Sequence, residues 1–401
     1  MKLLMLSNYF TPDLSAGSFR MQSLVDALEP WGGNGLEVDL ITTRPNRYAS
    51  LRTDALPFED RDWLRVHRIE LPPHKNGMAD QARAYIRYAV GVRKLTVAGN
   101  WDAVFATSSR LMTAGLGAMI ARRLQIPLYL DIRDLFTDNM KELLAGSPLK
   151  LLLPAFRMIE RQSFRRAARI NVVSQGFADH VRAVAPSAEL RIMTNGIDDL
   201  FLDPNFRKPD GNDKLPLVVY AGNMGEGQGL HRIIPPVASA LLDKVSFRLI
   251  GDGGRRKSLE AAVADLSLNN VELLPPVPRA SLLEHYREAD ILFMHLNDLE
   301  AFRKVLPSKV FEYAATNKPI LAGVSGYAAE FLSDHLPDAE VFEPLDAHRM
   351  TQAIERLIEA PPEPDRSDFR KAFARSNIME RLSRDILDMI DQPPGFCELA
   401  R

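Results

Sequence analysis

The chain has 401 residues, of which 46% are hydrophobic and 25% are charged, and its formal net charge is −2. This length suffices for two or three domains with substantial cores, and the composition is that of a soluble globular protein. A single cysteine, Cys397, excludes a disulfide framework and zinc-cluster spacing. We also expect no membrane-spanning helix and no signal peptide, because no apolar run is long enough and the N-terminal one lacks a small-residue cleavage site.

Short apolar runs alternate with helical patterns along the whole chain, which is typical of βαβ units with parallel sheets. The sequence therefore predicts an α/β fold with two Rossmann-like domains. The predicted strands of the first domain are residues 2–8, 37–43, 103–107, 127–132, 169–174 and 189–195. Those of the second domain are residues 216–222, 245–253, 271–277, 290–296, 319–324 and 340–344.

A polar segment rich in Pro, Gly and Asp separates the two sets of strands and lacks hydrophobic periodicity. It predicts an interdomain linker over residues 198–215, between domains at 1–197 and 216–365. Residues 366–401 begin with a long helical stretch that can cross back to the first domain. Two such domains are expected to face a central cleft, with ligands at the carboxyl ends of the strands.

Glycines follow several of the predicted strands. Gly17 precedes an amphipathic helix, Gly222 opens a loop with four glycines, and Gly251 opens another glycine-rich loop. Neither second-domain loop matches a dinucleotide fingerprint in the first βα turn or a P-loop. Such turns suit a phosphate-bearing ligand, although plain βα turns have the same composition.

Residues 304–322 place a cation where a helix begins. Pro307 and Ser308 are residues that often start helices, and Lys309 follows in the first turn. A helix N-terminus is partly positive, so Lys309 is unfavourable there unless an anion binds. Glu312 lies one turn further along and can accept two hydrogen bonds from a ribose diol. Alternatively, Lys309 and Glu312 are ordinary solvated residues of a surface helix.

At this point the chain resembles a known family. Residues 306–322, LPSKVFEYAATNKPILA, are similar to the signature segment of the family-four retaining glycosyltransferases, which have the GT-B fold. The resemblance is greatest to a bacterial branch that builds O-antigen, capsule and exopolysaccharide. Further segments agree in order and spacing, namely residues 7–28, 128–136, 194–198 and 220–230.

The resemblance implies transfer of a hexosyl or N-acetylhexosaminyl unit from a nucleotide-diphosphate sugar, UDP-linked by family habit, without a metal or other cofactor. It implies that Glu312 binds the ribose, that Ser308 and Lys309 bind the diphosphate, and that Val277 lies at the nucleobase. Gly17 would face the donor phosphates and sugar. The full set of expected donor-binding residues is Gly17, Gly222, Asn223, Gln228, Gly251, Val277, Ser308, Lys309 and Glu312.

Three departures from the family pattern affect the expected chemistry. Lys304 stands where the family usually has the first glutamate of its motif. The loop after the first strand of the second domain offers Asn223 and Gln228 in place of an Arg and Lys pair. The family's His-Asp pair aligns with Arg133 and Asp134. The expected catalytic residues are Asp134, with Asp131 as a second candidate, and Lys309, which would stabilise charge on the leaving phosphate.

The expected acceptor is a lipid-pyrophosphate-linked sugar or a glycan at the inner face of the cytoplasmic membrane, which makes the protein cytoplasmic with peripheral membrane contact. Residues 82–98 and 156–170 mix apolar and basic side chains, as do helices that lie on anionic lipid and many ordinary surface helices. Residues 1–200 carry 26 basic and 21 acidic residues. The sequence has no dense basic cluster with stacking aromatics, so we do not expect nucleic-acid binding.

Other functions remain open at this stage. A nonhydrolysing sugar-nucleotide epimerase would share the GT-B shape but would need clustered histidines and carboxylates after the strands. A catalytically degenerate partner of a polysaccharide-assembly complex would explain Lys304 and the missing Arg and Lys pair. A Rossmann dehydrogenase is the most distant alternative. The Asp60–Arg61–Asp62 triplet lies in a polar stretch, not after a clear strand, which argues against a metal site there.

Overall fold

The computed structural model describes residues 1–13, 15–45, 55–72, 78–108, 111–144, 147–202, 206 and 215–391. Cys397, much of the predicted linker and the end of the chain lie outside these residues. The chain divides into two compact units. Unit 1 consists of Met1–Asn195 and Arg375–Arg401, and unit 2 consists of Gly196–Ala374.

Unit 1 is built on an eight-stranded sheet in the order β3-β4-β2-β1-β5-β6-β7-β8. All neighbours are parallel except β3 and β4. The inner strands β5 and β6 are buried along their whole length, as expected for parallel strands covered on both faces. The strands are β1 (Lys2–Leu6), β2 (Glu37–Thr43), β3 (Phe58–Arg61), β4 (Leu64–Ile69), β5 (Ala103–Thr107), β6 (Leu128–Ile132), β7 (Arg169–Val172) and β8 (Glu189–Ile192).

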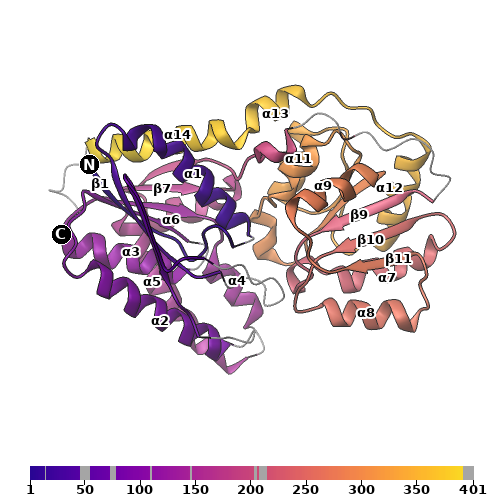
Figure 1. The fold of residues 1–401 in the computed structure, drawn as a ribbon. Coiled ribbons are helices and arrows are strands. Elements are labelled where there is room, and N and C mark those ends of the chain that lie inside the picture. Colours follow the sequence, from indigo (N-terminus) through magenta and orange to yellow (C-terminus); the bar gives the residue numbers. More distant parts are fainter. Residues whose placement is uncertain are drawn as a thin grey trace. The chain divides into compact units, whose positions relative to one another are not determined.

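Helices cover both faces of this sheet. In Figure 1, α1 and α14 lie on one face, and α2, α3 and α5 lie on the other. Leucines of α1 and α14 share one buried core with β1 and β2. The helical elements are α1 (Ala16–Gly32), α2 (Met78–Thr96), α3 (Leu111–Leu124), α4 (Phe136–Leu143), η1 (Pro148–Leu152), α5 (Leu153–Arg166), η2 (Gln175–Phe177), α6 (Ala178–Val184) and α14 (Arg375–Asp391).

Unit 2 contains a six-stranded parallel sheet in the order β11-β10-β9-β12-β13-β14. The chain runs outward from β9 to β11 and then crosses back to β12, which places a topological switch point between β9 and β12. The strands are β9 (Leu217–Ala221), β10 (Ser246–Ile250), β11 (Val271–Leu274), β12 (Ile291–His295), β13 (Ile320–Gly323) and β14 (Glu340–Phe342).

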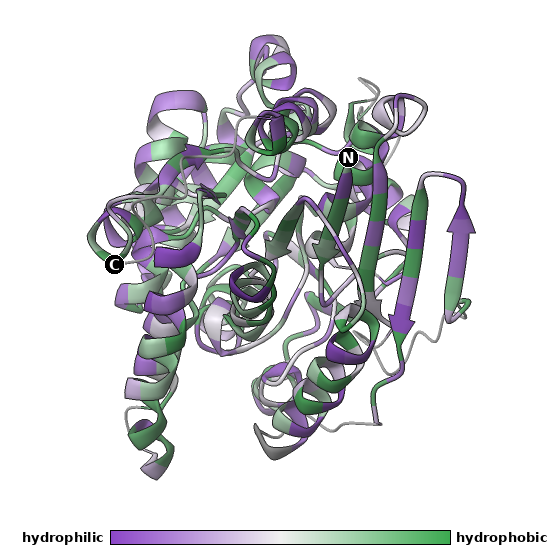
Figure 2. Ribbon diagram, turned by 90° about the vertical axis from the view of Figure 1, so that its left-hand side faces the viewer, coloured by the Kyte–Doolittle hydropathy of each residue, from purple (hydrophilic) through white to green (hydrophobic). Residues whose placement is uncertain are grey.

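Two buried clusters fill the two faces of the unit 2 sheet, one under α9, α10, α11 and α13 and the other under α7, α8 and α12. In Figure 2, where unit 1 faces the viewer, the inner strands of its sheet are mainly hydrophobic and the covering helices have hydrophilic outer sides. The helical elements of unit 2 are η3 (Asp199–Phe201), η4 (Glu226–Gln228), α7 (Leu230–Ala240), α8 (Arg256–Asp265), α9 (Arg279–Glu288), η5 (Glu300–Lys304), α10 (Lys309–Ala315), α11 (Tyr327–His335), α12 (Ala347–Glu359) and α13 (Ser367–Phe373).

All the strands predicted from the sequence are present, and the α/β fold with two parallel-sheet domains is confirmed. The β3–β4 hairpin was not predicted, because β3 is an exposed edge strand and β4 alternates buried and half-buried residues, so neither is a continuous apolar run. The Asp60–Arg61–Asp62 triplet, expected in a polar stretch outside the strands, is part of this hairpin. Asp60 and Arg61 belong to β3, and Asp62 forms the turn with φ +45°.

The domain limits also differ from the sequence prediction. Phe201 and Phe206, which fall in the predicted linker, are buried in the core of unit 2. The predicted C-terminal helix is two helices, because α13 stays with unit 2 whereas α14 packs against α1 in unit 1. The chain therefore passes between the units at Asn195–Gly196 and again at Ala374–Arg375.

Candidate functional site

The carboxyl edge of the unit 2 sheet carries two glycines where a side chain would not fit. Gly222 follows β9 with φ +150°, and Gly251 follows β10 with φ +146°, both in the region that favours glycine. A Cβ atom added to Gly251 would overlap the carbonyl oxygen of Gly222, and one added to Gly222 would overlap the Nζ atom of Lys309. The two glycines therefore allow two strand ends and one lysine side chain to pack together.

The backbone N–H groups of both glycines already have acceptors. Gly222 donates to the Ile250 carbonyl at 2.8 Å, and Gly251 donates to the Leu274 carbonyl at 3.0 Å. The guanidinium of Arg256 donates to the Gly251 carbonyl. The sequence suggested that these glycines bind the ligand, but these contacts show that they supply space for a close approach and not N–H donors for a phosphate.

Lys309 brings a positive charge to these glycines. Its Nζ atom lies 5.2 Å from the centroid of the Tyr220 ring, in a cation–π arrangement. Burial lowers the pKa of Lys309, and the nearby carboxylate of Glu312 acts in the opposite direction. An amine whose charged form is disfavoured by burial gains more than a solvated one from a bound anion.

Helix α10, which carries Lys309, is short. It has seven residues, and Ser308 before it has helical backbone angles of −60° and −23° and caps no N–H group with its side chain. The dipole of so short a helix is weaker than that of a long one. The amine of Lys309 is therefore the main positive group here, and the Ser308 hydroxyl does not have the capping role that the sequence suggested.

Glu312 is held by a buried tyrosine. The Tyr286 hydroxyl donates to Oε2 of Glu312 at 3.4 Å. Burial is the main cause that raises the pKa of Tyr286 well above its usual value, and the nearby Tyr313 and Glu312 add to it. The hydroxyl therefore stays protonated. The carboxylate thus has a fixed place one helical turn from Lys309, as the sequence suggested.

Asn223 and Gln228 face each other in the loop after β9. The Asn223 Nδ2 atom donates to Oε1 of Gln228 at 2.7 Å, and the same oxygen accepts from the Gly225 N–H at 3.3 Å. These bonds shape the loop. We expected the two side chains to contact the donor in place of the family's Arg and Lys pair, with the phosphate charge met by other groups. In this structure they are bound to each other.

His295, at the end of β12, was not foreseen from the sequence. Its Nδ1 atom bonds to the Gln228 carbonyl at 2.7 Å, and its Nε2 atom accepts from the Leu345 N–H at 3.0 Å. Burial lowers the pKa of His295 to about 4, against the opposing effect of the Gln228 carbonyl. A neutral imidazole with a proton on Nδ1 therefore joins the loops after β9 and β14.

The remaining predicted residues of unit 2 lie near this edge or on the surface. Val277 follows β11 and packs, partly buried, against the core cluster that contains Tyr286. Arg303, a further base close to the start of α10 in the sequence, is half exposed and lies 3.5 Å from a carboxylate oxygen of Glu300. Lys304 ends the short helix η5, so no carboxylate occupies the position of the family's first glutamate.

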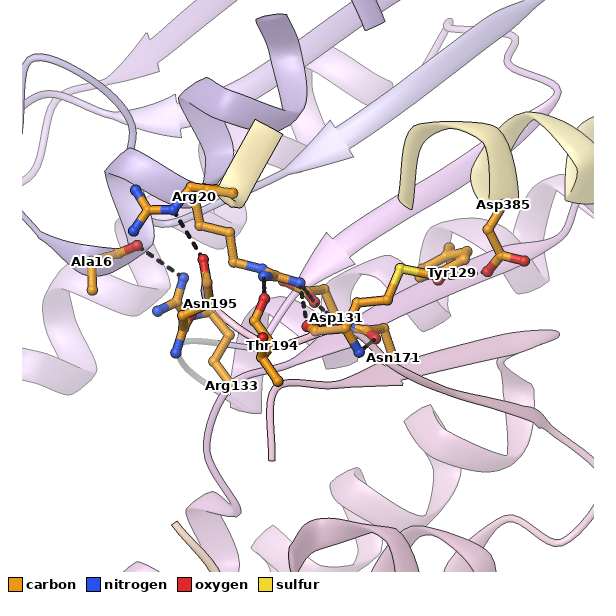
Figure 3. A network of polar contacts seen from close by, with 11 residues as sticks. Ala16, Arg20, Tyr129, Asp131, Arg133, Asn171, Thr194, Asn195 and Asp385 are labelled. Atoms are coloured by element: carbon orange, nitrogen blue, oxygen red, sulfur yellow. Dashed lines mark hydrogen bonds and ion pairs between the residues drawn. The ribbon is translucent and has the colours of Figure 1, made fainter. Parts of the chain in front are cut away.

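In unit 1, Asp131 is the centre of a buried ion pair (Figure 3). The Nε and Nη2 atoms of Arg20 donate to its two oxygens, both at 2.9 Å, and Asn171 donates to it at 2.7 Å. Burial opposes ionisation, but the charge of Arg20 outweighs it and lowers the pKa of Asp131. Asp131 is only 1% exposed. The sequence made Asp131 a catalytic candidate. Because it is buried, it has a structural role and does not contact a sugar.

Arg20 also bonds to the backbone of the loop after β8. Its Nη1 atom donates to the Thr194 carbonyl at 2.6 Å, and its Nη2 atom donates to the Met193 carbonyl at 3.1 Å. The next turn of chain is held by Arg375 of α14, whose Nε atom donates to the Asn195 carbonyl at 2.9 Å. The loop after β8 is therefore fixed by two arginines from opposite ends of the sequence.

Arg133 lies beside Gly17. Its Nη1 atom donates to the Ala16 carbonyl at 3.2 Å, and a Cβ atom added to Gly17 would lie 3.8 Å from that nitrogen. Burial and the nearby Arg20 lower the pKa of Arg133 to about 10, so it stays charged at neutral pH. Asp134 is exposed and opposes this shift. The sequence pointed to Asp134 here, whereas the structure places the Arg133 cation next to Gly17.

No group of three or more His, Cys, Asp and Glu side chains in the described part of the chain is arranged to hold a metal ion. Metal-independent action stays a prediction.

Two family models together cover most of the chain. The glycosyl transferase 4-like domain matches residues 18–196, and the glycosyl transferases group 1 family matches residues 203–375. Among curated proteins, WcaI of Escherichia coli (strain K12), named as a colanic acid biosynthesis glycosyl transferase, is 22% identical over 194 residues. The matched part spans about half of each protein, 47% of this chain and 47% of WcaI.

Solved structures of similar fold cover nearly the whole chain. Sucrose-phosphate synthase from Thermosynechococcus elongatus has a TM-score of 0.77 at 14% identity, over 97% of this chain and 99% of that chain. HepE of Anabaena in complex with UDP has a TM-score of 0.68 at 16% identity, over 97% of this chain and 100% of that chain. Structural similarity at such low sequence identity shows only the fold. The two family models show that the chain is a glycosyltransferase. The chain has the GT-B fold and belongs to the family-four glycosyltransferases.

Proposed function

We propose that the protein transfers a hexosyl or N-acetylhexosaminyl unit from a UDP-sugar, with retention, to a lipid-linked or polysaccharide acceptor in bacterial surface polysaccharide synthesis. The observation that carries this proposal is the position of Lys309, whose amine lies over Tyr220 and against Gly222. A donor diphosphate would lie on the Lys309 amine, and the ribose hydroxyls would donate to the Glu312 carboxylate, which Tyr286 positions.

The proposed chemistry uses the leaving diphosphate itself. The bond between the anomeric carbon and the diphosphate oxygen breaks, and negative charge grows on that oxygen. The ammonium of Lys309 stabilises this charge, with a large effect because the amine is partly buried. The acceptor oxygen attacks the same face of the sugar and gives its proton to the departing phosphate, so no protein nucleophile is needed.

Arg133 is the cation of unit 1 that this proposal uses. The family resemblance puts donor phosphate at Gly17, and a phosphate there would meet the Arg133 guanidinium. Asp134, which is exposed next to Arg133, remains the proposed polar group near the reacting sugar.

Two relatives support the choice of donor and pathway. HepE has been solved with UDP, with UDP and glucose, and with UDP-glucose, which supports a UDP-linked donor for this chain. The name of WcaI supports synthesis of an exopolysaccharide. The two matched families favour a glycosyltransferase over the epimerase alternative. A degenerate partner protein keeps two supporting observations, the lysine at position 304 and the uncharged Asn223 and Gln228 in place of the family's Arg and Lys pair.

The first test is thermal unfolding of the purified chain with UDP, GDP, ADP and dTDP. A ligand at 100 times its dissociation constant adds about 2.7 kcal/mol to the free energy of unfolding. We expect UDP to raise the unfolding temperature, Lys309→Met and Glu312→Gln to abolish most of that shift, and Lys257→Met, an exposed lysine of the same unit, to keep it.

The pH dependence of nucleotide binding adds a second readout. Because the pKa of Lys309 lies below its usual 10.5, its ammonium is lost earlier than that of a solvated lysine as pH rises. UDP affinity should therefore weaken below pH 10.5 in the wild type and change less in Lys309→Met. A UDP shift that survives in Lys309→Met would refute the assigned site. No shift with any diphosphate would favour the degenerate partner.

A further inference from the structure

One face of unit 1 is strongly basic. It consists of α2, η1, α3 and α5, which we call the basic–apolar face. These four elements contain eleven lysines and arginines and two acidic residues, Asp80 and Glu160, whereas the whole chain has 50 basic and 52 acidic residues. Glu160 is buried and bonded to Thr137 and His180, so it does not offset charge at the surface.

The positive charges on this face are poorly compensated. Arg83 lies 3.7 Å from Asp80, but none of the carboxylates in the described residues lies within ion-pair distance of Arg87, Arg157 or Arg161. Repulsion from the exposed Arg122, after the effect of burial, lowers the pKa of Arg166. Surfaces of this kind attract anions over a distance of about a Debye length.

The same face exposes large apolar side chains. Nine of the eighteen exposed large hydrophobic residues of the described chain belong to this face or to Val97 just after α2. The most exposed are Leu151 at 80% and Met119 at 69%. Helix η1 has no buried residue at all, although three of its five residues are leucines. Burying none of these leucines in the protein leaves their transfer free energy available to another apolar phase.

A groove joins the charged and apolar parts. It has a volume of about 670 Å³ and lies between α2, α3 and α5. Met119 and Ile159 line it together with Arg122, Arg165 and Arg166. Arg166 is held in place by bonds to the Ala121 and Ile126 carbonyls, both at 2.9 Å. Fixed guanidinium groups above apolar walls suit a molecule with a phosphate and a hydrocarbon part.

The described helices show no segment that is both long and apolar enough to cross a membrane. We propose that the basic–apolar face docks on an anionic lipid surface, with the η1 leucines entering the headgroup region and the groove arginines contacting lipid phosphates. Arginines around exposed leucines match such a surface in charge and in polarity. This docking would place unit 1 beside a lipid-linked acceptor, but it depends neither on the donor nor on the transfer chemistry.

The test is co-sedimentation of the full chain with vesicles. We expect binding to phosphatidylcholine vesicles that contain about one third phosphatidylglycerol, little binding to pure phosphatidylcholine, and weaker binding as salt shortens the Debye length. The double variants Leu151→Ser/Leu152→Ser and Arg157→Glu/Arg161→Glu should each bind about tenfold more weakly or worse. The exposed residues of unit 2 supply matched controls, Leu266→Ser and Arg349→Glu, which should bind as the wild type.

Several outcomes would overturn the proposal. They are the absence of binding to anionic vesicles, equal binding to neutral ones, and unchanged binding of the leucine variant. An RNA oligonucleotide that binds the wild type and the leucine variant equally would identify a general polyanion surface instead. All changed side chains are exposed, so both double variants should keep the wild-type unfolding temperature and its UDP shift. That shift separates failure of this proposal from failure of the proposed donor site.

Discussion

The two units organise the carboxyl edges of their sheets in different ways. In unit 1, the edge is held by buried charges, with Arg20 bridging Asp131 and two backbone carbonyls of the loop after β8. In unit 2, the edge is held by close backbone packing and by neutral groups, chiefly Gly222, Gly251 and His295. The same parallel-sheet architecture is thus stabilised by buried ion pairs in unit 1 and by close packing of neutral groups in unit 2.

This difference indicates where a charged ligand gains most. The carboxylate of Asp131 is already paired, so an additional ion at that point would have little to bind. In unit 2 the surroundings of Lys309 are aromatic and glycine-rich, and burial disfavours its charge. A diphosphate there would remove an existing penalty, because it favours the ammonium form that the protein alone disfavours.

The largest effect is expected in unit 1, for Arg20→Met. The substitution leaves Asp131 buried without its counter-ion, which should lower the free energy of unfolding by about 3 to 5 kcal/mol. All three tryptophans of the chain, Trp31, Trp63 and Trp101, belong to unit 1, so urea unfolding followed by their fluorescence reports on this unit.

The matched control for Arg20→Met is Arg384→Met, which removes an exposed ion pair with Glu380 and should change stability by less than about 1 kcal/mol. The double variant Arg20→Met/Asp131→Leu should recover most of the loss, since it removes both buried charges. A loss below about 1 kcal/mol for Arg20→Met would show that charge does not hold the unit 1 edge.

A pH effect of about 3 kcal/mol is expected in unit 2. The folded pKa of His295 is about 4, below the usual 6.5, so the unfolded chain binds more protons between these values. Stability should therefore fall as pH drops from 6.5 to 4, and the loss should be complete below the folded pKa. Hydrogen exchange of the β12 amides measures this loss of stability, and His295→Gln should not show the part of the loss that comes from His295. Equal slopes in both proteins would exclude His295 as the source.

A smaller effect is expected from a single methyl group, in Gly251→Ala. The new Cβ would overlap the Gly222 carbonyl oxygen at a backbone angle that alanine rarely adopts, so unfolding should become easier by about 2 kcal/mol. Thermal unfolding measures the change. Gly254→Ala, in the same loop but with no atom within 4 Å of the added Cβ, should be nearly neutral. Similar stability of the two variants would mean that close packing is unimportant here.

Much of the fold could be predicted because buried parallel strands are continuous apolar runs. The runs that became β5 and β12 are examples, since all of their residues are buried. The β3–β4 hairpin contains no such run, because β3 is an edge strand and β4 alternates buried and half-buried residues. The domain limits were displaced because burial of Phe201 and Phe206 depends on contacts with distant strands, which the polar composition around them conceals.

The candidate site was predicted in position more than in detail. Lys309 and Glu312 lie together as their spacing on one helix requires, and the glycines follow the strands as expected. His295 was missed, although a histidine at the end of an apolar strand was a visible signal. Asp131 is buried in an ion pair with Arg20, which was not expected, because a side chain's neighbours across the sheet are not encoded in its own segment.

The sequence by itself determined the order of strands and helices, the family and the helix that carries Lys309, because apolar periodicity and local motifs act over short stretches. Only the tertiary structure decided which polar groups are paired. Arg20 and Asp131 are 111 residues apart, and Tyr129 and Asp385 are 256 residues apart, yet each pair is in hydrogen-bond contact. Burial makes such partners obligatory, but the folded chain alone determines which distant residue is near enough to serve.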